Sequence, residues 1–131
     1  MGDLHISLLA AALAGVIVLW LGWRCGKVRL SDKITHGDGG NALLARRMRA
    51  QANFTEYTPV ALLLVLVLDL ADRDGWPLAL AALAFMLGRI LHAVGMDAEG
   101  AGWPRQAGMI LTMPILLGLA GWALLVGLAV V

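Results

Sequence analysis

Four residues with charged or hydrogen-bonding side chains recur at helical spacing just before a long apolar run. They are Arg49, Asn53, Glu56 and Tyr57. Their offsets of i, i+4, i+7 and i+8 place them on one face of an α-helix. Charges inside a bilayer cost at least about 2.5–3.5 kcal/mol each and usually face a bundle interior or a wet cavity. This stripe therefore predicts a polar site within a membrane protein.

A second polar stripe lies in the third apolar segment, where Arg89, His92 and Met96 are spaced i, i+3 and i+7. Arg105 follows after a short connection. Together with the arginine of the first stripe, these arginines outnumber the single glutamate, so they cannot all be neutralised by it. The remaining positive charge implies an anionic partner or water.

The elements that must position these side chains are long apolar segments. The chain has 131 residues, of which 60% are hydrophobic, whereas soluble domains are about 45–50% apolar. Its mean hydropathy is +0.82. A spanning helix needs about 20 mostly apolar residues, and four segments meet that need: residues 4–23, 41–70, 76–96 and 106–131. We predict an all-α fold, an integral membrane four-helix bundle forming one domain over residues 1–131.

The placement of Lys and Arg predicts how the bundle is oriented. The first connection and its flanks hold Arg24, Lys27, Arg29, Lys33, Arg46 and Arg47. In a four-helix topology the first and third connections share a side, so we predict that both are cytoplasmic and both termini lie on the opposite side. The two polar stripes then gather in the cytoplasmic half of the membrane. Arg46 and Arg47 are interpreted as part of the positive flank.

Charge and cysteine content narrow the function classes. The net charge is only +1, so no nucleic-acid partner is expected. The single cysteine, Cys25, excludes an intramolecular disulfide and a cysteine-based zinc cluster. No metal-ligand cluster is visible in the sequence, and no metal is predicted.

The polar residues also have purely structural interpretations. Arg49 could extend to the membrane interface, and Glu56 with Arg89 could form a buried ion pair that fixes helix register. His92 could be a satisfied polar residue of the bundle. Asp69, at the far end of the second segment, is interpreted as interfacial.

Several motifs resemble those of one membrane family. "RAQANFTEYTP" (49–59) is similar to the helix-two signature of the MAPEG proteins, the membrane-associated proteins in eicosanoid and glutathione metabolism. "GRILHAVGM" (88–96) resembles the helix-three segment, with Arg89 at the family's arginine position, and "RQAGMILT" (105–112) resembles the start of helix four. "VRLSDKITHGDGG" (28–40) resembles the first loop of bacterial members. The resemblance covers almost the entire chain in order and spacing.

The resemblance implies a homotrimer with glutathione bound between neighbouring protomers and open to the cytoplasm. The implied glutathione-binding residues are Arg29, Arg49, Gln51, Asn53, Glu56, Tyr57, Arg89 and His92. The arginines suit the two carboxylates, the glutamate the ammonium group, and the amides the peptide groups. Arg105 is the implied catalytic residue, because a nearby cation lowers the pKa of a thiol and raises its thiolate fraction. Membrane lipid and a lipophilic electrophile complete the expected partners.

The implied activity is that of a membrane-bound glutathione transferase, extending to glutathione-dependent peroxidase activity. One departure supports an alternative. Eicosanoid-type members carry tyrosines in helix three where this chain has His92 and Met96, and the spacing from Arg89 to Arg105 is slightly longer. The alternative is a non-catalytic membrane binding or regulatory protein that retains the anion-binding cavity. A transporter or channel is disfavoured because the polar groups stop halfway across the membrane.

Overall fold

The structure, a computed structural model, describes residues 4–131, which form four long helices and no strand. The helices are α1 (His5–Asp32), α2 (Ala42–Leu70), α3 (Trp76–Gly95) and α4 (Trp103–Gly127). All four are long and apolar enough to cross a membrane. The predicted all-α four-helix bundle is therefore confirmed. The first helix continues past the predicted span, from Trp23 to Asp32, and so carries the basic residues of its C-terminal turns on regular helix.

Local sequence signals set where the helices begin and end. Asn41 precedes α2, and its side-chain oxygen accepts a hydrogen bond from the Leu44 backbone N–H at 2.9 Å, which is a standard N-cap. Both α3 and α4 begin with a glycine followed by a proline in the first turn, where the missing N–H has no intrahelical partner to lose. The C-cap of α1, Lys33, has φ 54°, in the left-handed region.

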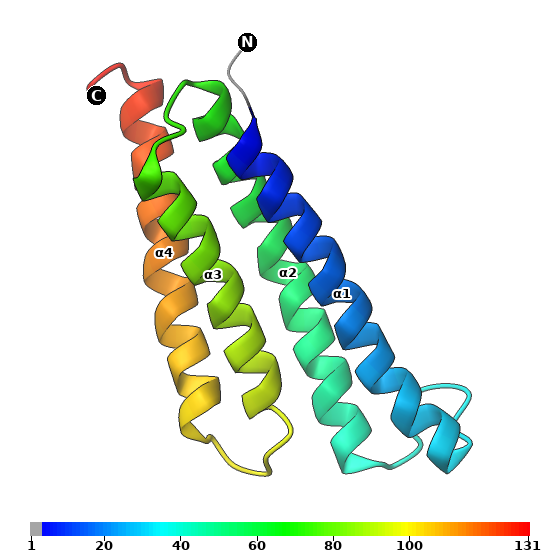
Figure 1. Cartoon of the computed structure of the whole chain (residues 1–131). Coiled ribbons are helices and arrows are strands. Elements are labelled where there is room, and N and C mark those ends of the chain that lie inside the picture. Colours follow the sequence, from blue (N-terminus) through cyan, green and yellow to red (C-terminus); the bar gives the residue numbers. More distant parts are fainter. Residues whose placement is uncertain (1–3) are drawn as a thin grey trace.

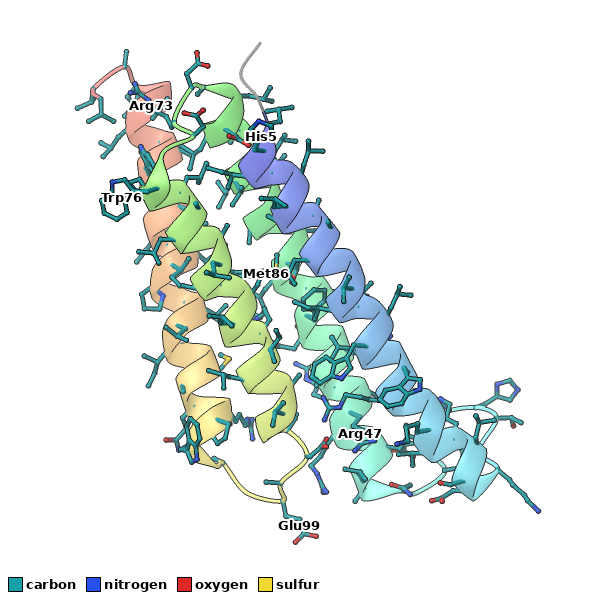
Figure 2. All side chains as sticks on the ribbon, in the orientation of Figure 1. His5, Arg47, Arg73, Trp76, Met86 and Glu99 are labelled. Atoms are coloured by element: carbon teal, nitrogen blue, oxygen red, sulfur yellow. The ribbon has the colours of Figure 1, made fainter. Side chains whose placement is uncertain are left out.

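The helices form two antiparallel hairpins, α1 with α2 and α3 with α4, which lie side by side (Figure 1). The connections 33–41 and 96–102 lie at one end of the bundle, whereas the short connection 71–75 lies at the other end, beside the start of α1 and the end of α4. Figure 2 shows Met86 of α3 directed toward the other hairpin. The predicted sharing of one end by the first and third connections is thus seen in the fold.

The α3–α4 hairpin is closely packed because glycines form its seam. A Cβ atom added at Gly108 of α4 would lie 2.5 Å from the Gly88 carbonyl oxygen and 2.6 Å from the His92 backbone nitrogen. Real side chains do not tolerate such distances, so only glycine lets the two backbones approach this closely. Small residues serve the same purpose in membrane helix pairs, where lipid gives no hydrophobic drive to association.

Apolar side chains form both the inside and the outside of this bundle. Large buried residues such as Leu21, Leu78 and Phe85 fill the centre. Many leucines also point outward, among them Leu19 of α1 and Leu117 of α4. A soluble protein rarely exposes so much apolar surface, but lipid is a suitable solvent for it. The fold is that of a membrane protein.

Candidate functional site

Arg89 is the buried centre of the polar cluster, with only 2% of its surface exposed. Its Nε donates to the Thr112 hydroxyl of α4 at 3.0 Å, its Nη2 donates to the Gly108 carbonyl oxygen at 3.4 Å, and its Nη1 donates to the Asn53 side-chain oxygen of α2. The Tyr57 ring lies beneath the guanidinium, 5.7 Å from it. Arg89 therefore joins three helices through neutral oxygens, and its charge is not cancelled by a carboxylate among these partners.

Glu56 does not pair with Arg89, which corrects the hypothesis of a buried register-fixing pair. Instead its carboxylate lies 3.5 Å from the Arg49 guanidinium, seven residues earlier on the same helix. The two side chains are 50% and 64% exposed, respectively. Seven residues make nearly two full helical turns, so both side chains project from the outer face of α2.

The four residues of the first stripe therefore lie in two different environments. Asn53 and Tyr57 contact Arg89 within the bundle, whereas Arg49 and Glu56 lie on the outside of the same protomer. In a single copy of the chain these two residues do not face the bundle interior, and the alternative, a wet cavity or a partner around them, stays a prediction. Helical periodicity predicts which residues share a face, but it does not predict how much of that face a neighbouring helix covers.

His92 and Arg105 approach each other across the α3–α4 hairpin. His92 is buried one turn after Arg89, and its backbone lies against Gly108. Arg105 is exposed in the first turn of α4. Arg89 lies one turn before His92, and Arg105 lies against Gly95, three residues after His92, so both positive charges act at this end of α3. The positive end of the α4 dipole adds to the same field.

Gln51 and Arg29 lie elsewhere, on the seam between α1 and α2. The Gln51 side-chain oxygen accepts a hydrogen bond from the Cys25 thiol of α1 at 3.7 Å. Arg29 donates to the Gly37 carbonyl oxygen at 2.7 Å and contacts the Met48 sulfur at 3.4 Å. Within one protomer these two predicted residues are not brought together with Arg89, since Gln51 is on nearly the opposite side of α2 from Asn53.

A second ionic cluster was missed by the sequence interpretation. Arg47 binds both carboxylate oxygens of Asp97 at 3.1 and 3.0 Å, and buried Arg24 donates to the same carboxylate. Burial raises the pKa of the Asp97 carboxyl, but the hydrogen bonds from Arg47 and Arg24 outweigh burial and hold that pKa below its usual value. Arg47 is thus a specific ligand of Asp97, where the sequence suggested only a positive flank.

A signal for this cluster was present in the sequence. The first and third connections were expected at the same end, and Asp97 is an acidic residue in the third connection, within reach of the basic first connection. The Arg24 guanidinium also stacks on the Trp20 ring, 4.8 Å from its centre. Pairing particular residues needs their three-dimensional positions, which topology alone does not give.

Asp69 is buried within the bundle, with 1% of its surface exposed, next to the last residue of α2, and its place at the membrane interface stays a prediction. One of its carboxylate oxygens accepts hydrogen bonds from the Ser7 backbone N–H at 2.9 Å and the Ser7 hydroxyl at 2.6 Å. Ser7 lies in the first turn of α1, whose N–H groups have no intrahelical partners and whose dipole favours a negative charge. Asp69 therefore stabilises the start of α1 from the end of α2.

An apolar groove runs along the outer side of the α1–α2 seam. It consists of two adjoining cavities of about 370 Å³ and about 320 Å³, which share Ala11 and Leu62. The second cavity reaches Phe54, Thr55 and Thr58, close in sequence to Glu56. Thr55 and Thr58 follow Gln51 at i+4 and i+7, so this groove lies on the Gln51 side of α2 and not on the face that carries the exposed ion pair.

Comparison with known proteins gives one family. Residues 7–125 match the model of the MAPEG family. The chain is similar to a protein named inner membrane protein YecN from Escherichia coli strain K12, with 27% identity over 112 residues that cover 86% of this chain and 85% of the relative. The protein of the same name from Escherichia coli O6:H1 strain CFT073 matches with the same identity and coverage.

Proposed function

The chain belongs to the MAPEG family, and on this premise we propose that it is a membrane-bound glutathione transferase. The family match and the four helices that could span a membrane indicate a membrane protein of a family that includes glutathione transferases. The observation that carries the finer proposal is the unbalanced positive charge around His92. Arg89 is buried among neutral oxygens, Arg105 lies in the exposed first turn of α4, and the Glu56 carboxylate pairs with Arg49.

Glutathione supplies the chemistry that this charge requires. It carries two carboxylates, which arginine forks bind well, and one ammonium group, for which Glu56 is a suitable partner. In this proposal Arg49 and Arg89 attract the carboxylates, and Asn53 and Tyr57 offer amide and hydroxyl contacts. The Arg89 guanidinium already donates to Asn53 and Thr112. In this proposal it therefore attracts a carboxylate mainly through its positive charge, and less through a bidentate hydrogen bond.

The exposed pair Arg49–Glu56 supports a site shared between copies of the chain. Leaving either charge in lipid is costly, at least about 2.5–3.5 kcal/mol on insertion scales. A neighbouring copy packed on the outer face of α2 would remove that cost. Gln51 and Arg29 face the other side of α2 and so could reach such a ligand only from the neighbouring copy. We therefore propose a homotrimer with glutathione at the boundary between protomers.

The proposed reaction uses the thiol of glutathione as nucleophile. Arg105, in the exposed first turn of α4, favours the thiolate through its positive charge. The thiolate sulfur forms a bond to an electrophilic carbon, and, for an aryl halide, the carbon–halogen bond breaks and halide leaves. A lipophilic electrophile would reach the thiolate from the bilayer. In the related peroxidase activity the same thiolate attacks a lipid hydroperoxide oxygen, the O–O bond breaks, and the lipid leaves as its alcohol after protonation. The glutathione sulfenic acid that forms then reacts with a second glutathione to give the disulfide and water.

One observation favours the non-catalytic alternative, a membrane binding or regulatory protein that retains the anion site. Met96 occupies a position where eicosanoid-type members carry a tyrosine, and it packs in the apolar core. The chain therefore offers no hydroxyl there to hold glutathione or its thiol. His92 is the polar group that remains on this stripe.

We further propose an inner-membrane location with connections 33–41 and 96–102 facing the cytoplasm. The two similar proteins are named as inner membrane proteins, and the Lys and Arg residues are concentrated at this end. Labelling of single engineered cysteines with a membrane-impermeant reagent in intact cells would check the orientation. Labelling in connection 33–41 from outside would contradict it.

The direct test measures glutathione binding and thiolate formation in the purified chain. Stopped-flow ultraviolet absorbance follows the thiolate, and conjugation of a generic aryl halide reports turnover. Arg105→Ala is expected to reduce thiolate formation about a hundredfold, in the range found for removal of one electrostatic stabiliser. Arg73→Ala is the matched control, because Arg73 lies at the opposite end of the bundle (Figure 2) and should leave both signals unchanged.

The outcomes separate the two candidates. Thiolate formation that depends on Arg105 supports the transferase. Glutathione binding without thiolate or conjugation supports the binding protein. Loss of neither binding nor turnover in Arg49→Ala, Glu56→Ala and Arg105→Ala would contradict the proposed site.

A further inference from the structure

Asp97, in the connection between α3 and α4, is held by cations from the other hairpin. Arg47 of α2 grips both carboxylate oxygens, at 3.1 and 3.0 Å, and Arg24 of α1 donates to one of them. Arg46 donates to the Asp97 backbone carbonyl oxygen at 3.1 Å. Figure 2 shows Arg47 directed toward this connection. The side chain and the backbone of Asp97 together are therefore hydrogen-bonded to both α1 and α2.

The same cations also reach the end of α3. Arg24 donates to the Ala93 carbonyl oxygen at 3.0 Å, and Arg47 donates to the Arg24 carbonyl oxygen at 3.0 Å. Carbonyl groups in the last turn of a helix have no intrahelical donors, so Arg24 satisfies one of them. The C-terminal end of α3 and the connection that follows it are therefore constrained as a unit.

Gly95, at the end of α3, packs closely against the backbone of Arg105. A Cβ atom at Gly95 would lie 2.3 Å from the Arg105 backbone nitrogen and 2.7 Å from its Cα atom. The last residue of α3 thus packs directly against the first turn of α4. Where the end of α3 is held, the backbone of Arg105 is held too.

The other contacts between the two hairpins do little to fix the C-terminal end of α3, so its position depends on the Asp97 cluster. Within residues 4–131, Arg89 joins α3 to Asn53 of α2 nearer the middle of the membrane, and the remaining packing between hairpins is largely apolar. Apolar packing is non-directional, and in lipid it has little advantage over packing against acyl chains. Directional contacts at the end of α3 come from the Asp97 cluster.

We propose that Asp97 is a positioning residue that sets where Arg105 stands relative to α1 and α2. This inference rests on the proposed role of Arg105 at the thiol. Asp97 does not touch the ligand. It acts through Arg24, Arg47 and the Gly95 contact, so its removal loosens the placement of Arg105 while the binding residues on α2 stay in place.

The test uses Asp97→Asn in the full chain in lipid nanodiscs. Asparagine keeps the shape and one acceptor but loses the charge that both arginines bind. Glu99→Gln is the matched control, because Glu99 is an exposed acid at the tip of the same connection (Figure 2). Glutathione affinity, thiolate formation and melting temperature are measured for each, with Arg105→Ala and Asp97→Asn/Arg105→Ala alongside.

The expected result separates positioning from folding. Asp97→Asn should leave the glutathione Kd within about threefold of the parent and lower thiolate formation about ten- to a hundredfold, as expected for a small misplacement of a catalytic group. The double variant should be no slower than Arg105→Ala, because both changes remove one effect. Losses that multiply in the double variant, or that only follow the unfolded fraction, would overturn the proposal.

A readout independent of glutathione separates failure of this inference from failure of the proposed function. Spin labels on cysteines at Lys27 of α1 and Gln106 of α4, both exposed, in a Cys25→Ser background report the distance between the hairpins by pulsed electron paramagnetic resonance. The distribution should broaden in Asp97→Asn but not in Glu99→Gln. An unchanged distribution overturns the positioning role. A broadened one without any glutathione signal in the parent chain overturns the transferase alone.

Discussion

Arg49 and Glu56 form an exposed ion pair that we expect to contribute little to folding and more to the proposed binding of glutathione. Both side chains are at least half exposed, and exposed ion pairs contribute only about 0–1 kcal/mol to stability. Their position on the outer face of a membrane helix is nevertheless expensive unless another surface covers it. The types of these two residues therefore indicate that a ligand or a protein partner covers them. Which of the two covers them determines whether the pair serves binding or assembly.

Arg49→Ala is therefore expected to affect binding far more than folding. The free energy of unfolding should change by less than about 1 kcal/mol, whereas glutathione affinity should fall at least about tenfold, because charged hydrogen bonds contribute about 1.5–3 kcal/mol. Isothermal calorimetry and thermal unfolding in nanodiscs measure the two effects. A large loss of stability with unchanged affinity would show the pair to be structural.

The Asp97 carboxyl gives a pH dependence with a definite sign. Its pKa in the folded chain lies below the ordinary value of 3.8, so its ionised form stabilises the fold at pH values above 3.8. That contribution is lost as the pH falls through the lowered pKa of the folded state. The charged groups that face Asp97 are Arg24 and Arg47, and neither loses its charge in this range.

Asp97→Asn should consequently melt below the parent at pH 7 and approach it below about pH 3.8. Thermal melting in nanodiscs between pH 7 and pH 3 measures the difference, and Glu99→Gln serves as the control, with no such change. A difference between Asp97→Asn and the parent that is constant across the range would show that the charge of Asp97 is not what stabilises the fold.

At the scale of elements, the α3–α4 hairpin fixes the relation between the buried and exposed parts of the candidate site. The glycine seam brings Arg89 and His92 of α3 against the start of α4. The Thr112 hydroxyl adds to this by donating to the Gly108 carbonyl oxygen at 2.7 Å while accepting from Arg89. Helix identity was readable from the apolar runs, but this close approach depends on single glycines whose role appears only in three dimensions.

Gly108→Ala is expected to disrupt this hairpin. The added Cβ would lie 2.5 Å from the Gly88 carbonyl oxygen, and relieving such a clash by moving backbone costs about 1–3 kcal/mol or more. Thermal unfolding should show the loss, and glutathione binding should weaken with it.

Gly118→Ala is the matched control for that variant, since it adds the same methyl group to the same helix. Nothing lies within 4 Å of the Cβ that it would introduce, so its melting temperature should equal or exceed that of the parent. Equal losses in Gly108→Ala and Gly118→Ala would mean that the close approach at Gly108 does not explain the effect.

At the scale of the whole molecule, the outer face of α2 is the surface that the single chain leaves unexplained. It combines the exposed pair Arg49–Glu56 with the exposed apolar side chain of Val60. Polar and apolar groups on one membrane-facing surface suit a protein partner better than lipid alone. This supports the proposed trimer, in which each site draws residues from two copies.

Native mass spectrometry in detergent should therefore give the mass of three chains. Val60→Trp, on the same face as the ion pair, should lower the trimer fraction because a bulky side chain would meet the neighbouring copy. Leu117→Trp is the control on the outward face of α4, where the leucine is 75% exposed. A monomeric parent chain, or equal effects of both tryptophans, would contradict assembly through α2.

The sequence by itself determined the four spanning helices, their order and the spacing of the two polar stripes, because these follow from apolar run length and helical periodicity. It also determined the family, through motifs such as 49–59 and 88–96. Only the tertiary structure decided the pairings between helices: Arg89 with Asn53 and Thr112, and Asp97 with Arg24 and Arg47. The physical reason is that periodicity fixes directions around one helix axis, whereas pairing depends on the distance and rotation between helices. Between α3 and α4, glycine contacts set that distance, and they carry no pattern of charge or polarity in the sequence.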